Sequence, residues 1–134
     1  METNRNYLGE FEELILLAVA SLVDDAYGVS VRKFILEEAD RSVNISAVHE
    51  GLRRLERKGL VESNVGGATQ VRGGRRKRYF VLTQFGRSTL RDIMSLTLQL
   101  YKKVPDFDLN LINEGTSTKM GRSVSAMVLQ AGTA

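Results

Sequence analysis

The greatest concentration of charge in the sequence lies between residues 72 and 78. Five of these seven positions are cationic: Arg72, Arg75, Arg76, Lys77 and Arg78. Tight backbone turns around the cluster are allowed by the glycines Gly66, Gly67, Gly73 and Gly74. Like charges crowded into a hairpin destabilise it mildly, so an anionic partner that neutralises the cluster explains it best. The alternative interpretation is a basic loop that only increases solubility.

A second set of candidate binding residues precedes the cluster on an expected helix between Asn44 and Gly59. Asn44 can accept a hydrogen bond from the first free amides of this helix, with Ser46 as an alternative cap, and Gly59 suits the position after its end. The apolar stripe of the helix consists of Ile45, Val48, Leu52 and Leu55. At about 100° per residue, the opposite side gathers Ser46, Glu50, Arg53 and Arg57, flanked by His49 and Arg54. The alternative to a recognition surface is a solvated charged face, in which Glu50 and Arg54 form an ordinary i,i+4 pair.

The elements that follow the expected helix predict how its charged face and the basic cluster come together. Leu60–Val65 and Tyr79–Leu82 contain the branched and aromatic residues typical of strands, and the basic cluster lies between them. Helix, strand, basic loop and strand in this order outline a winged helix-turn-helix. Residues 41–91 carry twelve basic and three acidic side chains, whereas residues 1–40 carry three basic and nine acidic ones. A positive face of this kind is the usual electrostatic footprint of nucleic-acid binding.

Two further amphipathic helices are expected before these elements. The first has apolar residues at helical spacing: Phe11, Leu14, Ile15, Ala18 and Leu22. The second runs from about Tyr27 to Ala39, and its core-facing positions lie among Val31, Phe34, Ile35 and Leu36. The predicted fold class is therefore mainly α with a small β-hairpin.

The last expected helix begins after Thr83, runs to about Lys103 and carries a long apolar stripe. A 4,3,4,3 spacing relates Leu90, Met94, Thr97, Tyr101 and Val104, and the stripe is widened by Ile93 and Leu100. If two copies dimerise through it, they present a symmetric pair of recognition helices, and the target is a pseudo-palindrome with half-sites about one helical turn apart. The alternative is that the stripe covers the chain's own core. From Asp106 onward the residues are loop-like and predict a flexible tail.

Composition argues against several other classes of protein. The 134 residues include no cysteine and one histidine, which leaves neither a nucleophile–base pair nor a metal site, so we expect no enzymatic activity and no cofactor. No Gly-Lys-Ser/Thr follows the glycines of the basic cluster, which excludes a nucleotide-binding phosphate loop. The longest apolar run, Leu14–Val23, is about half of what spans a bilayer, and no basic leader precedes it. We expect a cytoplasmic protein that does not contact membranes.

Several separated motifs resemble those of the PadR-type transcriptional regulators. The motifs are Leu8-Gly9, Phe11-Glu12, Leu14–Leu17, Ala26-Tyr27-Gly28, Leu52–Val61, Arg75–Thr83 and Gly86-Arg87. The sequence departs from the family at His49 and Glu50, where tyrosine and proline are common. The resemblance implies a winged-helix domain, a C-terminal helix that dimerises, and repression of transcription relieved by a small effector. We therefore predict a DNA-binding domain over residues 1–83, a dimerisation helix over 84–105 and a flexible tail over 106–134.

The resulting hypothesis is a homodimeric, sequence-specific regulator that binds double-stranded DNA. The predicted DNA-binding residues are Asn44, Ser46, His49, Glu50, Arg53, Arg54, Arg57, Arg72, Arg75, Arg76 and Lys77. We expect the cations of the hairpin to contact phosphates or the minor groove and the helix to contact base edges in the major groove. The alternative is a winged-helix module for RNA or protein contacts without sequence-specific DNA binding.

Overall fold

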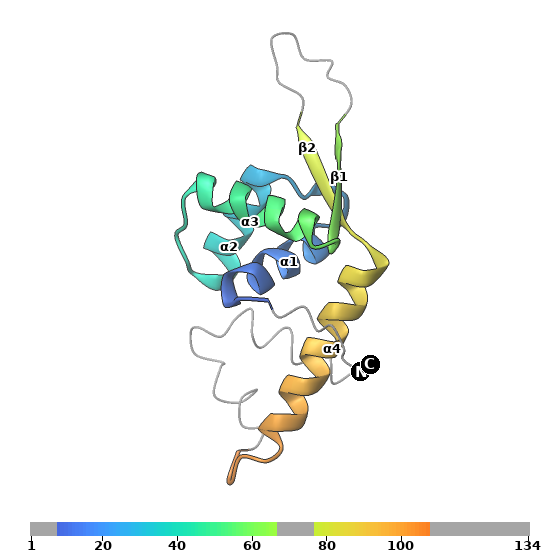
Figure 1. The fold of residues 1–134 in the computed structure, drawn as a ribbon. Helices are drawn as coiled ribbons and strands as arrows, with labels where there is room; N and C mark the ends of the chain where they lie inside the picture. Colours follow the sequence, from blue (N-terminus) through green and yellow to red (C-terminus); the bar gives the residue numbers. More distant parts are fainter. Residues whose placement is uncertain (1–7, 67–76, 108–134) are drawn as a thin grey trace. The chain divides into compact units, whose positions relative to one another are not determined.

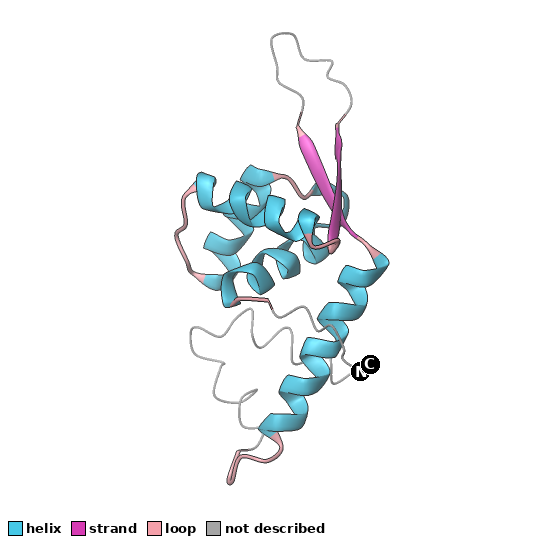
Figure 2. Ribbon diagram, in the orientation of Figure 1, coloured by secondary structure: helices cyan, strands magenta, loops and turns pink. Residues whose placement is uncertain are grey.

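The computed structural model describes residues 8–66 and 77–107, and residues 1–7, 67–76 and 108–134 lie outside the described part. In chain order its elements are α1 (Glu10–Leu22), the 3-10 helix η1 (Val23–Asp25), α2 (Gly28–Ala39), α3 (Ile45–Arg57), β1 (Val61–Val65), β2 (Arg78–Leu82) and α4 (Gln84–Tyr101). Figure 2 shows the helices together with one antiparallel pair of strands. The chain divides into two compact units, Met1–Ile93 and Met94–Ala134, and the boundary between them falls within α4. The expected fold class, mainly α with a small hairpin, is confirmed for the described residues.

Helices α1, α2 and α3 pack around a shared apolar core (Figure 1). Its buried side chains are Ile15, Leu16, Ala18, Val19, Ala26, Val31, Ile35, Val48, Leu52, Leu55, Leu60, Val61 and Phe80. The α3 residues of this set belong to the stripe predicted from the sequence, and Ile45 packs at its edge. In α1 the core also takes Leu16 and Val19, which the predicted spacing did not include, because α1 meets α2, α3 and the hairpin at once.

Helix α2 contributes three of its four candidate positions to the core. Val31 and Ile35 are buried and Phe34 packs against the core, as predicted. Leu36 is 49% exposed, so it is the one of the four candidates that does not face the core. It follows Ile35 by one residue, about 100° around the helix, and so it points away from the centre on which Val31 and Ile35 converge.

The ends of α3 follow the predicted capping chemistry. The Asn44 side-chain oxygen accepts a hydrogen bond from the Ala47 amide at 2.8 Å, so Asn44 and not Ser46 is the cap. Gly59 has φ +80°, a left-handed conformation that glycine adopts without steric cost. Around it, the Leu60 amide donates to the Leu55 carbonyl at 2.9 Å and the Gly59 amide to the Glu56 carbonyl at 3.0 Å. This pair of bonds ends the helix and directs the chain into β1.

The hairpin is attached to the helices at its base. Its register pairs Val61 with Leu82 and Ser63 with Phe80. The Phe80 amide donates to the Ala26 carbonyl, between η1 and α2, at 2.8 Å, and the Phe80 ring is buried in the core. Both strands are therefore held at the end nearest the helices, and the hairpin extends from there (Figure 1).

The start of α4 packs closely on the turn between α3 and β1. The Thr83 hydroxyl donates to the Gly59 carbonyl at 2.7 Å and accepts from the Gly86 amide at 2.9 Å. Gly86 is buried, and a Cβ atom at this position would overlap the Leu60 carbonyl oxygen. The first turns of α4 are thus fixed to the end of α3, and Leu90 packs against the core.

The apolar residues of α1 and α2 contribute to the core that these helices share with α3. No single helix in the described part of the chain is long and apolar enough to cross a membrane. Residues Glu10–Asp25 and Gly28–Ala39 are together long and apolar enough by length and composition only, and the two segments are bent by 119° relative to each other.

The substitution Gly86→Ala is expected to lower the free energy of unfolding by about 1–3 kcal/mol. The added methyl meets the Leu60 backbone, which cannot move without displacing a core residue. Urea unfolding followed by circular dichroism measures the change. Arg87→Ala, at the exposed neighbouring position of α4, is the control and should change stability by no more than about 0.5 kcal/mol. Equal unfolding midpoints for Gly86→Ala and the unsubstituted protein would contradict this packing.

Candidate nucleic-acid interface

A hollow lies where the start of α2, the exposed side of α3 and the start of β2 meet. Its lining residues are Tyr27, Gly28, Val29, His49, Arg53, Glu56, Lys77, Arg78 and Phe80. Two cations come from the hairpin and one from α3, although the sequence separates them by more than twenty positions. The hollow therefore brings together three of the predicted binding residues, His49, Arg53 and Lys77.

The other predicted residues of α3 lie as follows. Ser46 and Arg57 are exposed, Glu50 and Arg54 are partly exposed, and the Asn44 side chain caps the helix. Three cations of the predicted set, Arg72, Arg75 and Arg76, lie outside the described residues.

Tyr27 and Gly28 belong to the hollow, although sequence reasoning did not place them among the binding residues. A Cβ atom at Gly28 would overlap the His49 imidazole, so the absence of a side chain lets this ring lie against α2. The Tyr27 ring meets Tyr79 edge to face at 5.4 Å, and the Lys77 ammonium lies 4.3 Å from the Tyr27 ring centroid. This cation–π contact holds Lys77 at the hollow. The Tyr-Gly pair at the start of an expected helix was the available indication in the sequence.

A chain of hydrogen bonds joins β2 to the last turns of α3. The Arg78 guanidinium donates to the Ser63 hydroxyl at 2.9 Å, and that hydroxyl donates to the Glu56 carboxylate at 2.7 Å. Arg78 remains exposed. Arg78 is therefore positioned by β1 and α3 together.

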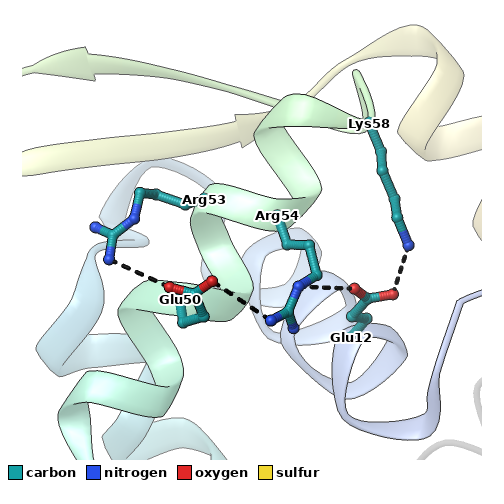
Figure 3. Close-up of polar contacts among 5 residues, drawn as sticks. All are labelled: Glu12, Glu50, Arg53, Arg54 and Lys58. Atoms are coloured by element: carbon teal, nitrogen blue, oxygen red, sulfur yellow. Dashed lines mark hydrogen bonds and ion pairs between the residues drawn. The ribbon is translucent and has the colours of Figure 1, made fainter.

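A row of alternating cations and carboxylates runs from the exposed side of α3 to α1 (Figure 3). In order, the row is Arg53, Glu50, Arg54, Glu12 and Lys58. The nitrogen–oxygen distances along it are 3.5, 3.4, 3.8 and 2.8 Å. One end, Arg53, lines the hollow, and the other end ties α3 to α1. Arg54 thus lies between two of the protein's own carboxylates.

Glu12 is the buried member of this row. Burial by itself raises the pKa of the Glu12 carboxyl, but two hydrogen bonds and two neighbouring charges outweigh it. Lys58 and the Gly9 amide donate hydrogen bonds to the carboxylate, and the charges of Lys58 and Arg54 stabilise its ionised form. The pKa of Glu12 therefore lies below its ordinary value, and the ionised carboxylate contributes to stability.

Most of the predicted dimerisation residues are exposed on α4 or just after it. The exposed set is Met94, Thr97, Leu100, Tyr101 and Val104, and Ile93 is partly exposed. Leu90 packs against the core of its own unit. The Tyr101 and Phe107 rings stack on each other, with centroids 4.7 Å apart. Among the described residues, no group of three or more potential metal ligands is found.

Comparison with known proteins supports the resemblance drawn from the motifs. The sequence matches the model of the "Transcriptional regulator PadR-like family" over residues 16–92. A solved PadR-like transcription factor from Bacteroides fragilis is 25% identical, with a TM-score of 0.59 over 69% of this chain and 84% of that one. A PadR family transcription regulator from Clostridium difficile R20291 is 26% identical, with a TM-score of 0.54 over 71% of this chain and 93% of that one.

A complex structure of hsRosR-S1 is similar over more of the chain. It is 22% identical with a TM-score of 0.59, and the match covers 90% of this chain and 95% of that one, which shows a likeness of fold alone. No curated protein matches the chain. These similarities confirm the predicted family resemblance and the predicted winged-helix fold, in which the β-hairpin is the wing.

Glu12→Gln is expected to flatten the loss of stability at acid pH. Because the pKa of Glu12 is lower in the folded state, its contribution is complete above about pH 4.5 and disappears as the pH falls through the folded-state value. At pH 7 the substitution should cost roughly 1–3 kcal/mol, since it removes the charged acceptor of Lys58. Unfolding free energies measured between pH 3 and 7 provide the check, with Glu62→Gln at an exposed position of β1 as the control. Parallel curves for Glu12→Gln and the unsubstituted protein would show that the carboxylate plays no such part.

Proposed function

The chain belongs to the PadR-like family of transcriptional regulators, and on that premise we propose that it is a sequence-specific DNA-binding repressor that acts as a homodimer. The observation that carries this proposal is the hollow, where Lys77 and Arg78 of the hairpin and His49 and Arg53 of α3 form one surface. Such a surface can meet phosphates and base edges of one duplex together.

The hairpin and α3 have different tasks in DNA binding. Lys77 and Arg78, with Arg72, Arg75 and Arg76 of the hairpin segment, neutralise phosphates or enter the minor groove, which gives affinity and salt dependence. Helix α3 enters the major groove and presents Ser46, His49, Arg53 and Arg57 to base edges. Arg53 is the strongest candidate for base recognition, because it is 60% exposed and an arginine can pair bidentately with guanine.

A homodimer accounts for the exposed apolar residues of α4 and the turn that follows it. Met94 and Leu100 are 56% and 57% exposed, and Tyr101 and Val104 are 43% and 47% exposed. Apolar residues that recur along one side of a helix are stabilised when a second copy covers them. Two copies joined in this way bind a pseudo-palindromic operator with half-sites about one helical turn apart. Relief of repression by a small effector is part of the proposal, and the stacked rings of Tyr101 and Phe107 are a candidate contact for it.

A gel-shift titration against the DNA upstream of the chain's own coding sequence tests the proposal. A random-sequence duplex of the same length serves as the comparison, and the salt concentration is varied. We expect tight binding to the upstream duplex that random DNA does not compete away. Binding that is salt-sensitive but equal for both duplexes would instead favour the alternative, a winged helix for RNA or protein contacts.

Substitutions in the hollow should separate the two tasks. Arg53→Ala should cost about 1–3 kcal/mol on the preferred duplex and much less on random DNA. Lys77→Gln should weaken binding to both duplexes alike and reduce the slope of log affinity against log salt by about one unit. Lys33→Gln removes an exposed cation of α2 outside the hollow and is the control. Equal losses on both duplexes for Arg53→Ala would defeat the assignment.

Leu100→Glu should dissociate the proposed dimer. The substitution places a carboxylate in the middle of the apolar stripe, where pairing would bury it. Sedimentation equilibrium should then show the mass of one chain at concentrations where the unsubstituted protein has the mass of two. Gln99→Glu adds the same charge to an exposed position on the other side of α4 and should leave the dimer intact. If both variants keep the mass of the unsubstituted protein, the stripe is not the interface.

A further inference from the structure

Glu50 is an acidic side chain on the side of α3 that carries the predicted recognition residues. Its two carboxylate oxygens accept from two different arginines, Arg53 at 3.5 Å and Arg54 at 3.4 Å (Figure 3). Both distances exceed the range of about 2.7–2.9 Å typical of strong charge-assisted hydrogen bonds. The two pairs are therefore weak enough to be exchanged for other partners, since exposed ion pairs contribute little to stability.

The two arginines are not held equally. Arg54 also lies 3.8 Å from Glu12, whose buried carboxylate belongs to the contact between α1 and α3. Arg53 is the more exposed of the two and lines the hollow beside the hairpin cations. If the contacts of Glu50 with both arginines broke, Arg53 would be free to act in the hollow. Arg54 would still have the Glu12 carboxylate as its partner.

We propose that Glu50 is a specificity-determining residue, which suppresses binding to non-cognate DNA by holding Arg53 and by repelling phosphates. This inference rests on the proposed DNA-binding function. On a non-cognate duplex, Arg53 can reach only phosphates, and such a contact is offset by the loss of its Glu50 partner and by the carboxylate's repulsion. At a cognate guanine, two aligned hydrogen bonds to Arg53 replace one long contact, and the exchange is favourable. Discrimination then comes from a penalty on the wrong partner, as specific interfaces often achieve it.

Glu50→Gln tests this role, because the amide keeps the shape of the side chain and removes its charge. Dissociation constants are measured on the duplex upstream of the chain's coding sequence and on a random duplex of equal length, at several salt concentrations. We expect affinity for random DNA to rise by about three- to tenfold, with a steeper salt slope, because one cation becomes available to phosphates. Affinity for the upstream duplex should change by less than about twofold, so the ratio of the two affinities falls.

Three further variants isolate the cause. Glu62→Gln removes the same charge from an exposed position of β1 and should leave the affinity ratio unchanged. Glu50→Asp keeps the charge and should retain weak binding to random DNA. In an Arg53→Ala background, Glu50→Gln should raise the affinity for random DNA by a smaller factor than it does alone, because the arginine that it would release is absent.

The outcomes distinguish this inference from the proposed function. If the unsubstituted protein binds both duplexes equally, the proposed function itself is wrong. If it discriminates between them but Glu50→Gln raises both affinities by the same factor, or neither, Glu50 has no role in discrimination and the inference is overturned. Circular dichroism melting of each variant shows whether α3 is intact, since loss of one i,i+4 pair costs only a few tenths of a kcal/mol.

Discussion

The shared surface of α3 and the hairpin depends on how β2 is attached to the helices. The Phe80 amide donates to the Ala26 carbonyl at 2.8 Å, and the Phe80 ring fills part of the core. β1 is already tied to α3 through the turn at Gly59. Because both strands are fixed at their base, the residues just beyond it, Lys77 and Arg78, lie beside α3. A hairpin free to rotate would not keep these cations next to Arg53, and the interface would lose its continuity.

The carboxylates around α3 control where its cations can act. Glu12 is buried and holds Lys58 at 2.8 Å, so this end of the row stabilises the packing of α3 on α1. Glu50 is half exposed and its contacts to Arg53 and Arg54 are longer, so this end can exchange partners. The helix is therefore held firmly on its inner side while its outer arginine stays available. The buried ion pair therefore stabilises the packing of the helices, whereas the exposed ion pairs leave an arginine available for recognition.

Local patterns predicted much of this arrangement. The apolar stripe of α3, its cap at Asn44 and the glycine after its end could be predicted because each depends on neighbours within one helix. The hairpin could be predicted because its strand residues flank a run of cations that no core would accommodate. The sequence did not show which of the four candidates in α2 is exposed, because spacing alone does not show how wide a stripe the neighbouring helices cover, and the structure identifies it as Leu36. Tyr27 and Gly28 were not assigned to the interface, because their role depends on His49, Lys77 and Tyr79 from distant parts of the chain.

The sequence by itself determined the types of the elements, the family resemblance and the concentration of positive charge in residues 41–91. These follow from residue type and short-range spacing, which act within a few turns of helix or one strand. Only the tertiary structure decided which cations meet across the hollow and which are paired with carboxylates. Arg53 and Arg54 are adjacent in the sequence, yet the first lines the hollow and the second lies next to Glu12. Their difference arises because packing of α1 on α3 puts a buried carboxylate beside one of them, and no local pattern contains that contact.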